Sequence, residues 1–167
     1  MRFLALILLF GPVSCYSQSE KYSVVNQSKE AGDNVTNARY WIVRNQLGDS
    51  ISLGSTWYRD WPAPKFFFIN NDRVAYEWGN ESKRTINVRD LISDKLLFSE
   101  EGVFSKIDNV NKVLFFFRKN ELLALDLDRL ESKTILVFES IDPIEFPELI
   151  VNSAKRTVDV NGISSKY

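Results

Sequence analysis

From residue 38 onward the chain consists of short runs of β-branched and aromatic residues, separated by turns rich in Asn, Asp and Gly. Such runs are typical of β-strands, because a helix needs about ten residues or more to bury one face. Asn70-Asn71-Asp72 is the strongest turn signal, since Asn and Asp tolerate left-handed backbone and hydrogen-bond to their own main chain. The pattern predicts an all-β domain of antiparallel hairpins with little helix.

The runs that we expect to form strands are residues 40–44, 51–53, 65–69, 73–78, 84–89, 96–98, 112–117, 122–126 and 134–138. Residues 56–64 contain two prolines and no regular period, so we expect a loop there. A single helical turn fits only residues 128–132 and 145–151, and Pro143 and Pro147 interrupt the second of these.

The strand pattern recurs along the chain. Val74 and Val113 occupy matching places 39 residues apart, and the pairs Asp90-Leu91 and Asp126-Leu127 follow the third strand of each unit 36 residues apart. A third copy begins in residues 149–160. Each unit reads as strand, polar turn, strand, turn, strand ending in Asp-Leu, connector and strand.

Over Lys65 to Phe138 this unit resembles the four-stranded blade of the β-propellers found in periplasmic and secreted proteins. A closed propeller needs at least about four blades, whereas this chain has two and some flanking strands. An ordinary antiparallel meander also spaces its hairpins in this way. We therefore expect a meander with blade-like four-stranded repeats that forms a two-layer or curled sheet, or that assembles with other chains.

Residues 3–10 form an unbroken apolar run after Arg2, followed by small and polar residues, which is the layout of a secretory signal peptide. The run is about half the length of a membrane-spanning helix, which argues against a retained anchor. Two endings fit the sequence. Cleavage after Ser17 would give a signal peptide of residues 1–17, whereas Val13-Ser14-Cys15 resembles a lipobox that would make Cys15 a lipidated residue, with Pro12 where that motif usually has Leu.

The signal peptide predicts an exported protein that is periplasmic, anchored to the outer membrane or extracellular. Residues 18–37 are polar and predict a flexible leader, with one short strand at 22–25 as an option. Residues 38–167 are then a single β domain, long enough to bury a sizeable core.

The chain has no histidine, and its only cysteine lies in the predicted signal peptide. This excludes Ser-His-Asp and Cys-His catalysis and zinc sites of the usual kind. Neither common glycine-rich phosphate loop occurs. We expect no cofactor, no metal and no enzymatic activity. The mature net charge of about −2 does not favour a nucleic-acid partner.

Trp57-Tyr58-Arg59-Asp60-Trp61 is the most unusual local cluster, with three large aromatic residues and an ion pair in five positions. Trp, Tyr and Arg dominate binding hot spots, so we predict Trp57, Tyr58, Arg59 and Trp61 as contact residues. The alternative is that the tryptophans fold back and cover the end of the sheet.

Three other groups of residues have both a functional and a purely structural interpretation. The triplets Phe66-Phe67-Phe68 and Phe115-Phe116-Phe117 must place Phe on both faces of their sheets, which predicts that both faces are covered or that one awaits a partner. Glu77 and Asp90 are candidates for a glycoside-cleaving pair. Asp126, Asp128 and Glu131 lie close in sequence but lack calcium-loop spacing, and a solvated turn is expected there.

These features predict an exported, non-enzymatic binding protein whose partner in the bacterial envelope is another protein. Two alternatives remain open: a carbohydrate-binding or carbohydrate-cleaving protein that uses the same aromatic residues with Asp60 and Glu77, and a structural envelope subunit that self-assembles through edge strands. The only membrane contact expected is a lipid anchor at Cys15.

Overall fold

The computed structural model describes residues 21–30, 35–44, 46–59, 64–80, 83–141 and 146–167, and within these ranges it contains strands and no helix. The strands form four antiparallel sheets, here named A to D. Sheet A contains β1 (Tyr22–Glu30), β2 (Val35–Arg44) and β3 (Ser50–Arg59); sheet B contains β4 (Phe66–Ile69), β5 (Arg73–Gly79), β6 (Arg84–Asp90) and β7 (Leu96–Glu101); sheet C contains β8 (Val103–Asp108), β9 (Val113–Arg118), β10 (Glu121–Asp126) and β11 (Glu131–Val137); and sheet D contains β12 (Leu149–Asn152), β13 (Thr157–Val160) and β14 (Ile163–Lys166).

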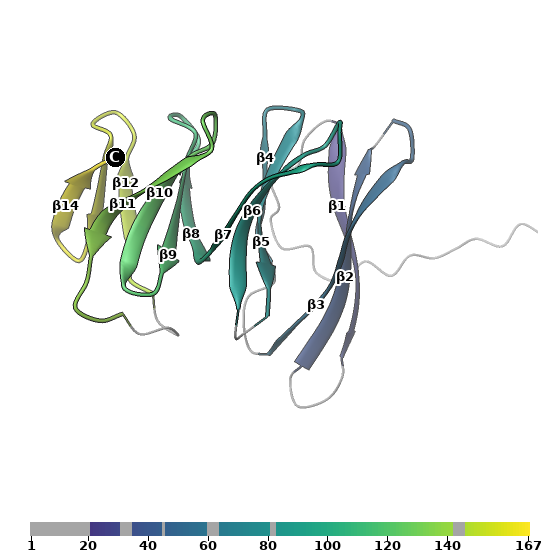
Figure 1. Cartoon of the computed structure of the whole chain (residues 1–167), viewed down its shortest axis with the longest axis horizontal. Helices are drawn as coiled ribbons and strands as arrows, with labels where there is room; N and C mark the ends of the chain where they lie inside the picture. Colours follow the sequence, from purple (N-terminus) through teal and green to yellow (C-terminus); the bar gives the residue numbers. More distant parts are fainter. Residues whose placement is uncertain (1–20, 31–34, 45, 60–63, 81–82, 142–145) are drawn as a thin grey trace, which may run out of the picture.

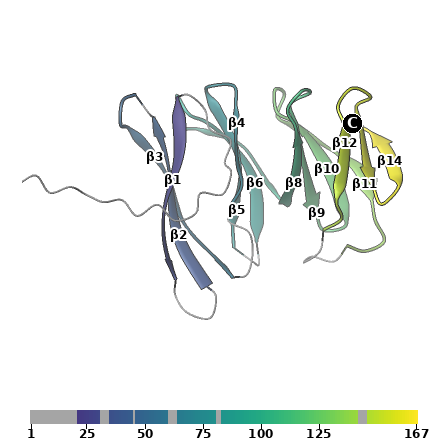
Figure 2. The ribbon, with the colours of Figure 1, turned by 180° about the vertical axis from the view of Figure 1, so that it is seen from behind.

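The four sheets stack face to face in chain order (Figures 1 and 2). Within each sheet, strands that are consecutive in sequence are hydrogen-bonded neighbours, so each sheet is a simple meander. The predicted all-β class, the antiparallel meander and the blade-like four-stranded repeats are confirmed. The sheets are not closed or strongly curled, and they form a series of four layers.

Three hydrophobic cores hold the stack together, one between each pair of successive sheets. Sheets B and C are apolar on both faces because each lies between two other sheets. Phe66 and Phe68 point toward sheet A, whereas Phe67 packs into the core shared with sheet C. In β9, Phe116 packs toward sheet B, and Phe115 and Phe117 pack toward sheet D. The prediction that both faces of each triplet are covered is confirmed.

The Asp-Leu pairs close each repeat by the same hydrogen bond. The N–H of Leu91 donates to the carbonyl of Asp72 at 2.7 Å, and the N–H of Leu127 donates to the carbonyl of Lys112 at 3.0 Å. In sheet D, the N–H of Tyr167 donates to the carbonyl of Arg156 at 3.1 Å in the corresponding place. The residue after the third strand is thus tied to the residue before the second strand in all three sheets.

Burial explains why these positions are apolar. Leu91, Leu127 and Tyr167 are at most 8% exposed and each packs into one of the three cores. The preceding aspartates cap the turns that follow: Asp90 accepts from the N–H groups of Ile92 and Ser93, and Asp126 from those of Asp128 and Arg129. The Asp supplies the turn, and the Leu supplies the apolar contact between sheets.

The structure differs from the predicted elements at the N-terminal side. Within the predicted flexible leader of residues 18–37, residues 22–30 and 35–37 form strands, because β1 pairs with β2 along its whole length. The side chains of Tyr22 and Val24 pack into the core between sheets A and B. The predicted loop of 56–64 is a strand as far as Arg59, since its prolines come only at 62 and 64. Residues 1–20, which include the predicted signal peptide and Cys15, lie outside the described residues.

The other differences concern the connectors of sheets C and D. No helical turn forms at 128–132 or in the described part of 145–151, because β11 begins at Glu131 and β12 at Leu149. The sequence pattern does not predict β8, whose alternation is broken by a bulge between Phe104 and Lys106. In the part of the chain that the structure describes, there is no helix with the length and hydrophobicity to cross a membrane.

Candidate functional site

A groove of about 440 Å³ opens between sheets B and C. Glu77 of β5 and Arg84 of β6 line it on one side, and Phe104 of β8 lines it on the other. The other charged residues of its wall are Lys65, just before β4, Lys106 of β8 and Glu148, just before β12. Here Glu77, a candidate catalytic residue from the sequence, contacts the guanidinium of Arg84 within sheet B and the backbone of Phe104 in sheet C.

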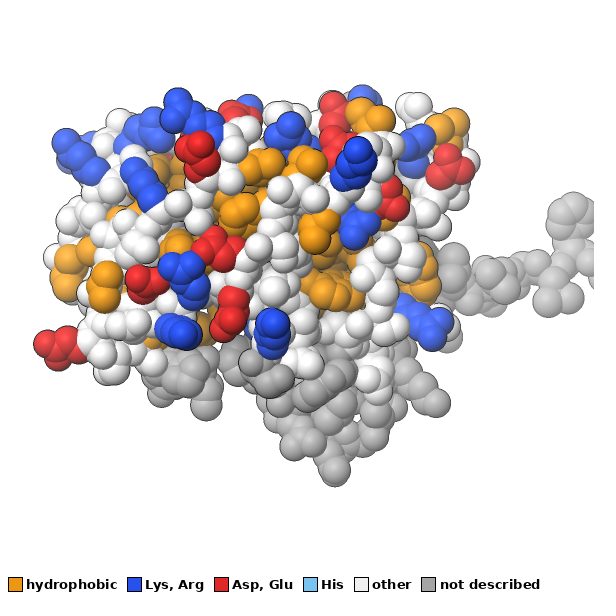
Figure 3. All heavy atoms as spheres, in the orientation of Figure 1, with side chains coloured by type: hydrophobic (Ala, Val, Ile, Leu, Met, Phe, Trp, Pro, Cys, Tyr) orange, Lys and Arg blue, Asp and Glu red, His pale blue; other side chains and the backbone are white. Residues whose placement is uncertain are grey.

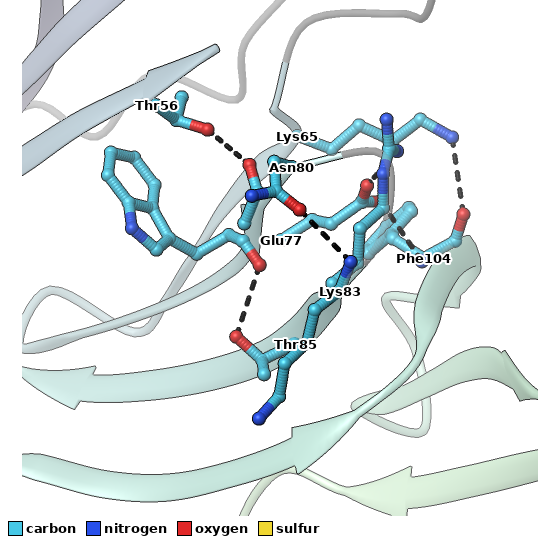
Figure 4. A network of polar contacts seen from close by, with 10 residues as sticks. Thr56, Lys65, Glu77, Asn80, Lys83, Thr85 and Phe104 are labelled. Carbon is cyan, nitrogen blue, oxygen red and sulfur yellow. Dashed lines mark hydrogen bonds and ion pairs between the residues drawn. The ribbon is translucent and has the colours of Figure 1, made fainter. Parts of the chain in front are cut away.

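Glu77 is buried, with 5% of its surface exposed, and both of its carboxylate oxygens are engaged (Figure 4). Its Oε1 forms an ion pair with the guanidinium of Arg84, and its Oε2 accepts the backbone N–H of Phe104 at 3.1 Å. Lys65 donates through Nζ to the carbonyl of Phe104 at 3.4 Å and lies 5.1 Å from the centre of the Phe104 ring. These contacts join sheet B to sheet C.

Burial raises the pKa of Glu77, while the charge of Arg84, the N–H of Phe104 and the charge of Lys65 act in the opposite direction without cancelling the rise. A raised carboxyl pKa in a groove is a common property of acid–base residues. Structural ion pairs shift pKa values as well, and here each oxygen already has a partner. The arrangement is that of a link between sheets.

The same network reaches sheet A (Figure 4). The hydroxyl of Thr56 in β3 donates to the carbonyl of Gly79, the last residue of β5. Gly79 has a φ of 132°, and a Cβ added there would overlap the carbonyl oxygen of Lys83, so this position requires glycine. Thr85 donates to the carbonyl of Trp78 at 3.1 Å.

The predicted contact cluster lies partly in β3. Trp57, Tyr58 and Arg59 pair with Asn37, Thr36 and Val35 of β2, respectively, in the three positions that follow Thr56. Because Thr56 already contacts the last residue of β5, this end of sheet A runs past sheet B, as Figure 1 shows. Asp60 and Trp61 lie outside the described residues.

The proposed pair of carboxylates does not form a site. Asp90 pairs with Arg73, whereas Glu77 is four residues further along β5, a separation of roughly 13 Å at the rise of a strand. Glycosidase carboxylates are separated by about 5 to 9.5 Å. Hydrogen bonds from the backbone and hydroxyl of Ser93 lower the pKa of Asp90, which is occupied as the cap of its turn.

The acidic residues after β10 have structural partners as well. Asp126 caps its turn, and Asp128 forms an ion pair with Lys112 at 3.1 Å. Among the described residues, no three acidic, His or Cys side chains are placed to hold a metal ion together. The interpretation of this segment as a solvated turn agrees with the exposure of Asp128 and Arg129.

A buried polar cluster lies between sheets C and D, and the sequence pattern does not predict it. Asp108, at the end of β8, is 2% exposed and accepts hydrogen bonds from the hydroxyl of Tyr167, from Asn111 Nδ2 at 2.7 Å and from Ser153 Oγ at 2.8 Å. Burial alone would raise the pKa of Asp108, but these bonds outweigh it and lower the pKa to about 2. Burial and the bond to Asp108 raise the pKa of Tyr167 to about 12.

Only part of this cluster left a signal in the sequence. The turn Asp108-Asn109-Val110-Asn111 is recognisable because Asp108 accepts from the N–H groups of Val110 and Asn111. Tyr167 is 59 positions away, and no local pattern connects it to Asp108. The chain matches no known protein-family model, and no similar sequence is found among curated proteins.

Proposed function

We propose that this protein is an exported, non-enzymatic binding protein whose partner in the bacterial envelope is another protein. The proposal combines the signal-like apolar run of residues 3–10 with a contact surface at the end of sheet A. Its localisation, its partner class and its contact residues are inferred from the sequence, and the pairing of β3 with β2 supports the choice of these residues.

The observation that carries the proposal is the extension of β3 beyond the neighbouring sheet. Trp57, Tyr58 and Arg59 are the residue types most enriched in binding hot spots. They occupy consecutive positions on a strand that is paired with β2, just beyond the contact between Thr56 and Gly79. The backbone of a strand that is already paired loses less conformational entropy on binding than the backbone of a free loop would.

A catalytic role has less support. The carboxyl group of Glu77 is the candidate acid whose pKa is raised, and both of its oxygens are bound. Its proposed partner, Asp90, lies roughly 13 Å away along the strand. Two carboxylates this far apart do not flank one glycosidic bond.

Exposed apolar residues on sheet B also favour a macromolecular partner over a sugar. Ile92, Leu96 and Leu97 are 69%, 50% and 37% exposed and lie on β7 and the turn before it. β7 is an edge strand, with one side of its backbone unpaired in the sheet. An exposed edge with apolar side chains is suited to contact with another polypeptide.

Site-specific photo-crosslinking of the full chain in living cells tests the proposal. A photoreactive residue placed at Tyr58 should yield one discrete crosslinked protein, whereas the same residue at Ser52, an exposed position on the same strand, should not. A product of twice the mass of the chain would indicate the self-assembling subunit instead. Loss of glycan binding in Trp57→Ala, with no crosslinked protein at either position, would contradict the proposal and favour the carbohydrate alternative.

A further inference from the structure

A second and larger groove, of about 690 Å³, opens between sheets C and D. Its lining includes five cationic residues from three separate segments: Arg129 and Lys133 around the start of β11, Lys155 and Arg156 in the turn before β13, and Lys166 at the end of β14. Figure 3 shows Lys and Arg side chains gathered over the end of the molecule that β11 to β14 form in Figure 1.

The shape of the groove follows from the register of β10 and β11. Lys133 pairs with Ala124, and Ala124 faces sheet D as part of the third core. The neighbours of Ala124 in that core include Phe115, Phe117 and Leu122, so a small residue at this place leaves a hollow. The same alternation puts Glu131, two positions before Lys133, on the face toward sheet D.

The cations of the groove lack acidic partners among the described residues. Arg129, Lys133, Lys155 and Lys166 form no ion pair there, although Lys112 nearby is paired with Asp128. The guanidinium of Arg156 lies 5.9 Å from the centre of the Tyr167 ring. All five cationic residues are exposed.

Two carboxylates line the groove, and they do not neutralise it. Asp126 is occupied by the N–H groups of Asp128 and Arg129, and Glu131 forms no ion pair with a described residue. Five positive charges against two negative ones leave an excess of three.

We propose that this groove binds a small molecule that carries two or more phosphate groups. A phosphate group carries about −1.5 to −2 charges at pH 7, so two of them match the excess charge of the groove. The cations come from three segments, and a ligand with several charged groups can contact them together. Arg129 offers the planar fork that binds phosphate in a bidentate manner, and the lysines add point charges. The volume lies within the range of small-molecule sites, about 300 to 1,000 Å³.

Isothermal titration calorimetry of the full chain with inorganic tripolyphosphate tests this site. We expect saturable binding that weakens as salt is added, because the contacts are exposed ion pairs. The double substitution Arg129→Gln/Lys133→Gln should weaken binding at least about tenfold, since each lost charge-assisted contact is large compared with thermal energy. The double substitution Lys95→Gln/Lys119→Gln is the matched control, because it removes the same number of charges from exposed lysines outside the groove and should leave the affinity unchanged.

Three results would overturn the proposal. The first is no binding of tripolyphosphate by the wild-type chain at low salt. The second is equal weakening by Lys95→Gln/Lys119→Gln and by the groove variant, which would mean that binding depends only on the net charge of the protein. The third is binding of citrate, a tricarboxylate of similar charge, as tight as that of tripolyphosphate, which would mean that the site does not select phosphate.

Discussion

Two grooves open between successive sheets of the stack, and they differ in whether their charged side chains are paired. In the groove between sheets B and C, Glu77 and Arg84 are buried and paired, and their contacts join two sheets. In the groove between sheets C and D, Arg129, Lys133, Lys155 and Lys166 are exposed and form no ion pair with described residues. A buried charge must be compensated for the chain to fold, whereas an exposed charge can remain free for a ligand.

Sheets B, C and D combine a shared structural element with junctions that differ in charge. Sheets B, C and D share the hydrogen bond after their third strand, made by Leu91, Leu127 and Tyr167. The charged residues at their junctions differ. Between sheets B and C, Glu77 and Arg84 form a buried pair, and between sheets C and D, cationic residues surround a groove that Ala124 lines.

Removing the acid of the buried pair should have the largest effect. We expect Glu77→Ala to lower the free energy of unfolding by about 3 to 5 kcal/mol, because Arg84 keeps a buried charge without this partner. Glu77→Gln should cost less than Glu77→Ala, since its amide oxygen still accepts one of the two hydrogen bonds, although its NH2 group then faces the other donor. Urea denaturation measures both values, and an Ala variant as stable as the wild type would contradict the structural role of Glu77.

The bond between Tyr167 and Asp108 should make the stack sensitive to alkali. The pKa of Tyr167 is raised from 10.0 to about 12, so its contribution is complete below pH 10 and is lost as the pH rises toward 12. The shift corresponds to about 2 to 3 kcal/mol. Thermal melting between pH 9 and pH 12 checks this, with Tyr167→Phe as the control that should flatten the alkaline slope. An identical slope in that variant would be evidence against the bond.

The hydrogen bonds that Asp108 accepts should also make the protein less stable in acid. The pKa of Asp108 is lowered from 3.8 to about 2, so its contribution is complete above about pH 4 and is lost as the pH falls toward 2. The expected loss is about 2 kcal/mol, and it shares one bond with the alkaline effect, so the two values do not add. Asp108→Asn should show a shallower acid slope in chemical denaturation at pH 2 to 5. A slope equal to that of the wild type would contradict this assignment.

The cations of the groove between sheets C and D should contribute least to stability. We expect Lys133→Gln and Lys155→Gln to change the free energy of unfolding by no more than about 0.5 kcal/mol, because both side chains are exposed and neither forms an ion pair with a described residue. Denaturation in low and high salt measures this. A loss of several kcal/mol would mean that these residues hold the fold, and the contrast between the grooves would disappear.

Local patterns in the sequence predict most of the hairpins, because each turn and its flanking strands are close in sequence. Asn70-Asn71-Asp72 and the two Asp-Leu pairs mark the hairpins and the ends of the third strands of sheets B and C. Polar β1 was expected to belong to a flexible leader, since its pairing with β2 depends on only a few apolar residues such as Tyr22 and Val24.

The grooves were harder to predict, because their residues come together only when the sheets stack. Lys133 and Lys155 are far apart in sequence and belong to different sheets, so neither stands out as part of a basic cluster. Glu77 was recognised as a candidate acid, but its partner at Phe104 is a backbone N–H on β8, a strand that the alternation does not predict.

The contrast between the two grooves is tested most directly by nuclear magnetic resonance titration of the labelled full chain with tripolyphosphate. We expect concentration-dependent shifts of the amide signals of Arg129, Lys133, Lys155 and Lys166, with the signals of Glu77, Arg84 and Phe104 unchanged. Shifts of equal size around both grooves, or shifts confined to the groove that contains Glu77, would contradict it.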